Sequence, residues 1–198
     1  MALRRKHLLL VFAATIALGA PGKALATGGS YVFDGGTKQE RTQVKAALTA
    51  SSFNWSVVPA TVTIHIERGT ESHAKKGQIW LDADLVDTGR FAWGAVQHEY
   101  GHQVDFFLLD DSMRAALLAR LGGKSWCTLA PGLTHADLGC ERFASSLAWS
   151  YWSVAANCMR PTSALDEAGS IGASEFRVLL GSLLQRPLMR VLGAKRRP

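Results

Sequence analysis

Two histidines and a glutamate in the middle of the chain have the spacing of a metal site. The segment reads His98-Glu99-Tyr100-Gly101-His102, an H-E-x-x-H motif. Residues four apart lie on one face of a helix, so both imidazoles can reach the same ion. Glu99 lies beside that face, where a carboxylate can take a proton from water activated by the metal. The motif therefore predicts one zinc ion per chain, bound by His98 and His102, with Glu99 as general base.

A catalytic zinc needs a third protein ligand. One standard extension places glycine three residues and histidine or aspartate six residues after the second histidine, and it is excluded because Asp105 and Leu108 occupy those positions. Glu141, on a later helix, is the candidate. It shares a helix face with small residues such as Ala144 and Ser145, which would let that helix approach the motif closely. The alternative is an ordinary solvent-facing glutamate near a helix N-terminus.

These two segments resemble the gluzincin metallopeptidases. The resemblance lies in His98-Glu-Tyr-Gly-His-Gln-Val-Asp105 and in Glu141-x-Phe-Ala-x-x-Leu-Ala-x-x-Tyr151. It is strongest to the compact branch related to the anthrax lethal factor catalytic domain and the bacterial Pro-Pro endopeptidases. The resemblance implies zinc bound by His98, His102 and Glu141, a zincin-like catalytic domain, and hydrolysis of peptide bonds in a peptide or protein substrate.

The oxyanion donor departs from that family's pattern. The relatives place a tyrosine seven residues before the ligand glutamate, and here that position is Thr134. His135 beside it is our candidate for the role, and Tyr151 is the more distant one. Asp105, one turn beyond His102, is expected to orient an imidazole through its second nitrogen. The alternatives are a plain loop histidine, a packing tyrosine and a surface acid.

Strands lie early and helices late, an α+β order. Thr61 to Glu67 alternates apolar and polar residues like a half-buried strand. Gln78-Ile79-Trp80-Leu81 is predicted to be a strand near a sheet edge, and the resemblance implies that it aligns peptide substrate. We expect a small mixed sheet packed on the active-site helix and a helical C-terminal half. The other expected elements are a strand at 31–33 and helices over 37–49, 89–109, 112–121, 137–154 and 174–184, with capping residues at Thr37 and Ser112.

The N-terminus predicts export. Arg4-Arg5-Lys6 precedes the apolar run Leu8 to Ala20, and Ala24-Leu25-Ala26 is a small-x-small cleavage signature. Residues 1–26 are therefore predicted to be a Sec signal peptide, cleaved after Ala26. The apolar run is shorter than the roughly 20 residues that span a bilayer, so an uncleaved anchor is the weaker alternative. We expect one secreted domain over residues 27–198, monomeric and free of the membrane after cleavage.

The charge of the chain is concentrated at its ends. The net charge is +6, yet four of the 22 lysines and arginines precede residue 27 and three lie in the last four residues. Removing these seven leaves 15 bases against 16 acids. No nucleic-acid motif occurs, so no nucleic-acid partner is expected. A rival function from another class is a secreted structural or binding module that holds zinc without turnover.

Three cysteines, Cys127, Cys140 and Cys158, fit one disulfide and one remaining thiol in an exported protein. A helix over 137–154 would hold Cys140 and Cys158 too far apart to be bridged. Cys127 is therefore expected to pair with one of these two. Three free thiols is the alternative.

Overall fold

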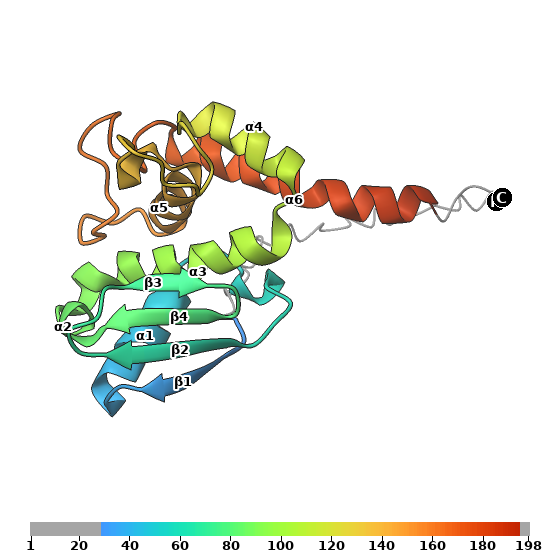
Figure 1. Ribbon diagram of the computed structural model, residues 1–198. Coiled ribbons are helices and arrows are strands. Elements are labelled where there is room, and N and C mark those ends of the chain that lie inside the picture. The colour runs from blue at the N-terminus through green and yellow to red at the C-terminus, as the bar shows by residue number, and fades with distance from the viewer. Residues whose placement is uncertain (1–28, 195–198) are drawn as a thin grey trace, which may run out of the picture.

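A computed structural model of the chain describes residues 29–194. The predicted signal peptide and the basic residues after 194 lie outside this part. Figure 1 shows one sheet with helices packed behind and above it. The sheet is mixed, with the order β1-β2-β4-β3, in which β1, β2 and β4 are parallel and β3 is antiparallel to β4. Its strands are β1 (Tyr31–Gly35), β2 (Val62–Glu67), β3 (His73–Lys75) and β4 (Gln78–Asp82).

The strand β4 is an inner strand, which corrects the expectation that Gln78 to Leu81 lies at a sheet edge. A two-residue turn, Lys76-Gly77, joins β3 to β4, and Gly77 adopts the positive φ of 81° that favours glycine. The hairpin leaves β4 paired with β2 on one side and β3 on the other. The edge beyond β4 therefore belongs to β3.

The helices match most of the predicted ones. The capping box at Thr37 is present, since its hydroxyl accepts from the Glu40 amide at 3.2 Å while the Glu40 carboxylate accepts from the Thr37 amide at 2.6 Å. None of the described helices is long and apolar enough to cross a membrane. The helices are α1 (Lys38–Ala50), α2 (Ala83–Val86), α3 (Trp93–Leu108), α4 (Asp111–Leu121), α5 (Gly139–Tyr151) and α6 (Ala173–Ala194), with 3₁₀ turns at Trp55–Val57, Gly89–Ala92 and His135–Asp137.

Two helix boundaries differ from those expected. Asp110, rather than Ser112, caps α4, because its carboxylate accepts from the Met113 amide at 2.9 Å. The last helix, α6, continues to Ala194, well past the expected end at Leu184. Both differences lie away from the predicted metal site.

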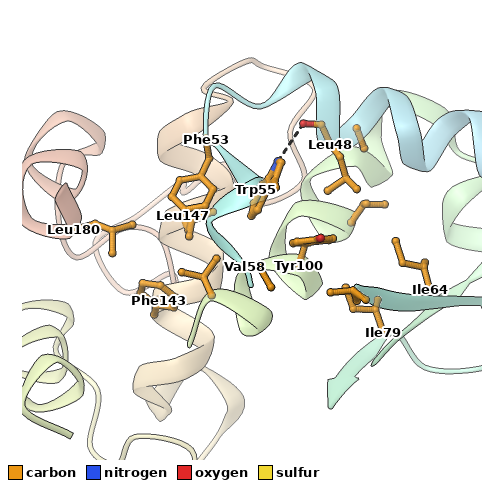
Figure 2. Packing of buried hydrophobic residues seen from close by; sticks show 14 of the residues in the cluster. Leu48, Phe53, Trp55, Val58, Ile64, Ile79, Tyr100, Phe143, Leu147 and Leu180 are labelled. Carbon is orange, nitrogen blue, oxygen red and sulfur yellow. Dashed lines mark hydrogen bonds between the residues drawn. The ribbon is translucent and has the colours of Figure 1, made fainter. Parts of the chain in front are cut away.

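The helix α3 occupies the centre of the molecule, between the sheet and α5 (Figure 1). Its Tyr100 side chain is fully buried against Trp55, with ring centroids 5.2 Å apart, and Phe53 packs on the other side of Trp55 at 4.8 Å (Figure 2). Trp55 Nε1 donates to the Leu48 carbonyl at 3.1 Å. Large buried rings contribute strongly to core stability. They fix the rotation of α3 and so the direction in which its histidines point.

A close helix contact brings α3 against α5. A Cβ atom added to Gly101 would lie 3.3 Å from Ala144 Cα and 3.5 Å from Ala144 Cβ, at the tight end of van der Waals contact. The expectation that small residues let the two helices approach closely is confirmed. The glycine inside the H-E-x-x-H motif thus has a packing role.

One disulfide joins Cys127 to Cys140, with the Cα atoms 5.5 Å apart, and Cys158 is a free thiol. The predicted participation of Cys127 is confirmed, and its partner is Cys140. The bond connects the loop after α4 to the first turn of α5, directly before Glu141.

Candidate metal centre

Three side-chain atoms from two helices converge on one point. His98 Nε2 lies 3.1 Å from His102 Nε2 and 3.1 Å from Glu141 Oε2, and His102 Nε2 lies 3.3 Å from the same oxygen. Ligand atoms around a tetrahedral zinc, with bonds of about 2.0–2.1 Å, are separated by about 3.3–3.4 Å. The structure therefore brings together the three predicted ligands at a spacing that fits one zinc ion.

The general-base candidate faces the same point. The ligand atoms of His98, Glu99 and His102 all lie within 4.8 Å of one another. Glu99 is buried, and its Oε2 atom has no hydrogen-bond partner among the described residues. Burial raises the pKa of this carboxyl above its usual value, against the opposing charges of His98 and His102. A buried unpartnered oxygen is costly, so this atom suits a water molecule or substrate entering the site.

The ligand carboxylate is held ionised. Burial alone would raise the pKa of Glu141, but the neighbouring imidazoles of His102, His135 and His98 keep it below the usual range. The side chain is only 13% exposed, so these partners replace most of its contact with water. Two imidazoles and a carboxylate are the donor set of many catalytic zinc sites. A second possible group, Cys127, Cys140 and Glu141, offers no thiolates because its cysteines are joined to each other.

His135 lies at the rim of the site. Its Nε2 is 3.0 Å from Glu141 Oε2 and its Nδ1 is 2.6 Å from Glu167 Oε1. Hydrogen bonds to Glu141 and Glu167 raise the pKa of His135 to about 10. The side chain is 64% exposed, unlike the two buried histidines. His135 can therefore reach a substrate that enters from solvent.

Tyr151, the other oxyanion candidate, lies at the opposite end of α5 from Glu141. Ten residues of helix separate the two by about 15 Å. The tyrosine ring packs edge-on against Phe53, with centroids 5.0 Å apart. The structure thus brings His135 to the site, while the half-buried Tyr151 packs against the core.

Asp105 does not contact either ligand histidine. Its Oδ1 accepts from Arg114 Nε at 2.8 Å and its Oδ2 from Trp126 Nε1 at 3.0 Å. The guanidinium gives a charge-assisted bond and the indole N–H donates to the second oxygen, so both oxygens are engaged. The expected role of orienting an imidazole is replaced by a role in tying α3 to α4 and to the loop that contains Trp126.

The strand residues predicted to align substrate also lie elsewhere. Ile79 and Leu81 are buried in the core, while Trp80 stacks between His65 and His73 with centroid distances of 4.7 Å on each side. None of Gln78 to Leu81 lines the cleft, and of β4 only its last residue, Asp82, does. Residues of β3 and of the segment before it line the cleft instead.

Two residues that sequence reasoning did not assign complete the network. Ser145 Oγ lies 3.0 Å from His98 Nδ1 and 2.6 Å from Glu167 Oε2. Ser145 follows Glu141 by one helical turn, a spacing that could have indicated a shared site. Glu167 comes from the loop between α5 and α6, where no periodicity marks a functional residue.

The site opens into a cleft of about 690 Å³. Its floor is formed by the α3 motif, and its walls by the edge of the sheet and the loops that contain His135 and Glu167. The lining residues nearest the motif are His98, Glu99, His102, His135, Glu141 and Glu167, and those of β3 and the loop before it are Thr70, Glu71, Ser72, His73 and Ala74. Comparison of the chain with protein-family models, curated proteins and solved structures found no match.

Proposed function

We propose that the protein is a zinc-dependent endopeptidase of zincin-like fold. The proposal is carried by one observation, the convergence of His98 Nε2, His102 Nε2 and Glu141 Oε2 within 3.3 Å of one another at the floor of an open cleft. The unpartnered oxygen of Glu99 beside them supports a catalytic role over a purely structural one. A structural zinc site is normally closed by a fourth protein ligand.

His98, His102 and Glu141 would hold the zinc. When bound there, zinc would supply Lewis acidity, which lowers the pKa of a water molecule to about 7. Glu99 Oε2 would accept a proton from the water that attacks the scissile carbonyl and would then donate that proton to the leaving amine. Glu99 suits both transfers because its Oε2 atom is buried beside the candidate ligands and has no other partner among the described residues. His135 Nε2, which lies 3.0 Å from Glu141 Oε2, would donate as well to the oxyanion that develops beside that ligand.

The substrate is proposed to be an extended peptide bound along β3. This strand pairs with β4 on one side, and no other described strand pairs with its second side. An open edge of this kind presents backbone N–H and C=O groups that a peptide can pair with as an added strand. The residues Ser72 to Ala74 line the cleft, so a peptide added there would pass over the metal site.

The proposal includes export of the enzyme. The basic and apolar N-terminal residues favour a signal peptide, and the Cys127–Cys140 disulfide is typical of oxidising compartments. Both features support a protease that acts outside the cytoplasm.

Replacing the general base tests the function directly. Glu99→Gln keeps the shape of the side chain but removes its ability to accept a proton. We expect zinc to remain at one ion per chain and hydrolysis of a peptide library to fall at least about 10²–10⁴-fold. Zinc is measured by mass spectrometry of the intact protein with and without chelator, and hydrolysis by product profiling. Glu175→Gln, an exposed glutamate on α6, is the matched control.

Three outcomes would count against the proposal. Full activity of Glu99→Gln would remove Glu99 from the mechanism, and failure of a chelator to inhibit would remove the metal. A wild-type protein that binds one zinc per chain and cleaves no peptide would favour the rival function, a zinc-binding module without turnover.

A further inference from the structure

We infer that Glu167 is a positioning residue for the metal centre. It orients His98 indirectly, through Ser145, and it orients His135 by direct contact. The inference rests on the proposed function. The two carboxylate oxygens of Glu167 have different partners: Oε2 lies 2.6 Å from Ser145 Oγ, and Oε1 lies 2.6 Å from His135 Nδ1. Each partner in turn contacts a candidate metal ligand: Ser145 contacts His98, and His135 contacts Glu141.

The hydrogen bonds that run from Glu167 through Ser145 determine which nitrogen of His98 carries a proton. An ionised carboxylate only accepts hydrogen bonds, so the Ser145 hydroxyl donates its single proton to Glu167. The same hydroxyl lies 3.4 Å from the sulfur of Met159, but a thioether is a weak acceptor. The Ser145 oxygen is then left to accept from His98 Nδ1–H at 3.0 Å. His98 Nε2 therefore keeps its lone pair for a metal.

The direct contact orients His135. A hydrogen bond from Nδ1 to Glu167 holds the plane of an imidazole that is otherwise 64% exposed, with Nε2 directed toward Glu141. An exposed side chain with this much freedom would sample several rotamers without such a partner. One carboxylate thus aligns both a ligand and the oxyanion donor.

The loop that contains Glu167 is itself anchored, as a positioning role requires. The Asp166 carboxylate accepts from the backbone amides of Thr162 at 2.6 Å and Ser163 at 3.0 Å. Arg142, a buried residue of α5, donates to the Leu165 carbonyl at 3.3 Å and to the Ala136 carbonyl at 2.6 Å. One guanidinium therefore ties together the two loops that present Glu167 and His135.

The test separates metal binding from catalysis. In Glu167→Ala both acceptors are lost, and in Ser145→Ala the path to His98 is broken while the contact to His135 stays. Loss of an outer partner of a metal ligand costs about 10–100-fold in metal affinity. We expect zinc affinity, measured by chelator competition, to fall about tenfold in each variant, and the visible spectrum of the cobalt-loaded protein to change. Glu175→Ala, which removes an exposed glutamate, should change neither.

The double variant tests whether the two residues form one path. If Glu167 acts on His98 through Ser145, then Glu167→Ala combined with Ser145→Ala should bind zinc about as tightly as Glu167→Ala alone. Additive losses would show independent roles and overturn the relay. Wild-type zinc affinity and an unchanged cobalt spectrum in Glu167→Ala would overturn the inference as a whole.

The readouts keep the two proposals apart. Unchanged metal binding in the variants, with peptide hydrolysis by the wild type, would remove Glu167 from the site and leave the protease proposal standing. Weakened binding in the variants of a protein that cleaves no peptide would support Glu167 and reject the protease proposal. Thermal melting of the metal-free proteins checks that each variant is folded.

Discussion

At the scale of single residues, the three imidazoles of the site differ in burial and in what faces their nitrogens. His98 and His102 have side chains that are 6% and 8% exposed and face each other across the ligand carboxylate, whereas His135 is 64% exposed at the rim. A buried imidazole cannot follow a substrate, but it holds a fixed ligand position well. This difference in exposure supports the proposed roles of His98 and His102 as metal ligands and of His135 as a substrate contact.

Removal of His135 should lower kcat more than it changes KM. His135→Ala deletes a donor that acts on charge developing in the transition state, and loss of one such donor costs about 10²–10³-fold in kcat. Zinc content should stay at one per chain because the three ligands remain. Steady-state kinetics on a cleaved peptide measures the effect.

Tyr151→Phe is the control for that experiment, because its ring packs on Phe53 in the core. We expect the Tyr151→Phe variant to have the same kcat as the wild-type protein. A large loss in Tyr151→Phe together with normal turnover in His135→Ala would reverse the assignment.

At the scale of elements, the site depends on the separation of α3 and α5. Two of the proposed zinc ligands come from α3 and the third from α5, and the helices touch where Gly101 meets Ala144. Helix separation therefore determines how far Glu141 stands from the two histidines.

A side chain at Gly101 should weaken metal binding by separating the helices. Gly101→Val places branched carbon atoms where even a Cβ would lie 3.3 Å from Ala144 Cα. Overpacking of this kind costs about 1–3 kcal/mol in free energy of unfolding. We expect that loss in urea denaturation, and weaker zinc binding in chelator competition.

Gly181 of α6 provides the comparison, because nothing lies within 4 Å of an added Cβ there. Gly181→Val should leave zinc affinity unchanged. Equal zinc affinity in both variants would show that the Gly101 contact does not set the ligand spacing.

The sequence predicts those parts of the fold and the site that depend on residues close together in the chain, and it does not predict those that depend on tertiary contacts. His98, Glu99 and His102 follow from the periodicity of a single helix, and Glu141 from the small residues around it. The inner position of β4 could not be predicted, because strand order depends on a hairpin whose first strand, His73–Lys75, has only three residues. Glu167 lies in a loop, where side-chain direction depends on tertiary contacts alone.

Asp105 illustrates a different limit. Its spacing from His102 was compatible with an imidazole contact, but Arg114 and Trp126 compete for the same oxygens. Helix periodicity specifies which face a side chain occupies, and it does not specify the partner it meets there.

At the scale of the whole molecule, a disulfide and hydrogen bonds hold the loops over the candidate metal centre. The Cys127–Cys140 bond closes a loop that contains His135, and Arg142 joins that loop to the one containing Glu167. The sheet and α3 provide the floor, and these tied loops provide one wall.

Loss of the disulfide should destabilise the protein without preventing metal binding outright. For a loop of this size, with the cysteines 13 residues apart, the bond is worth about 3 kcal/mol. We expect Cys127→Ser combined with Cys140→Ser to lower the free energy of unfolding in urea by about that amount.

Cys158→Ser leaves the disulfide intact and is the matched control, since its thiol is free. It should show a clearly smaller change. A double variant as stable as the wild type would mean that the loop is held by its non-covalent contacts alone.

The position of the disulfide also bears on the order in which the protein matures. Cys140 directly precedes Glu141, and the closed loop contains His135, so oxidation restrains the third ligand and the rim histidine together. In the reduced chain α3 would still present its two histidines, but the carboxylate opposite them would lack this restraint. We therefore expect cysteine oxidation to come before tight zinc uptake, so that the timing of activation follows the redox state the chain meets after synthesis.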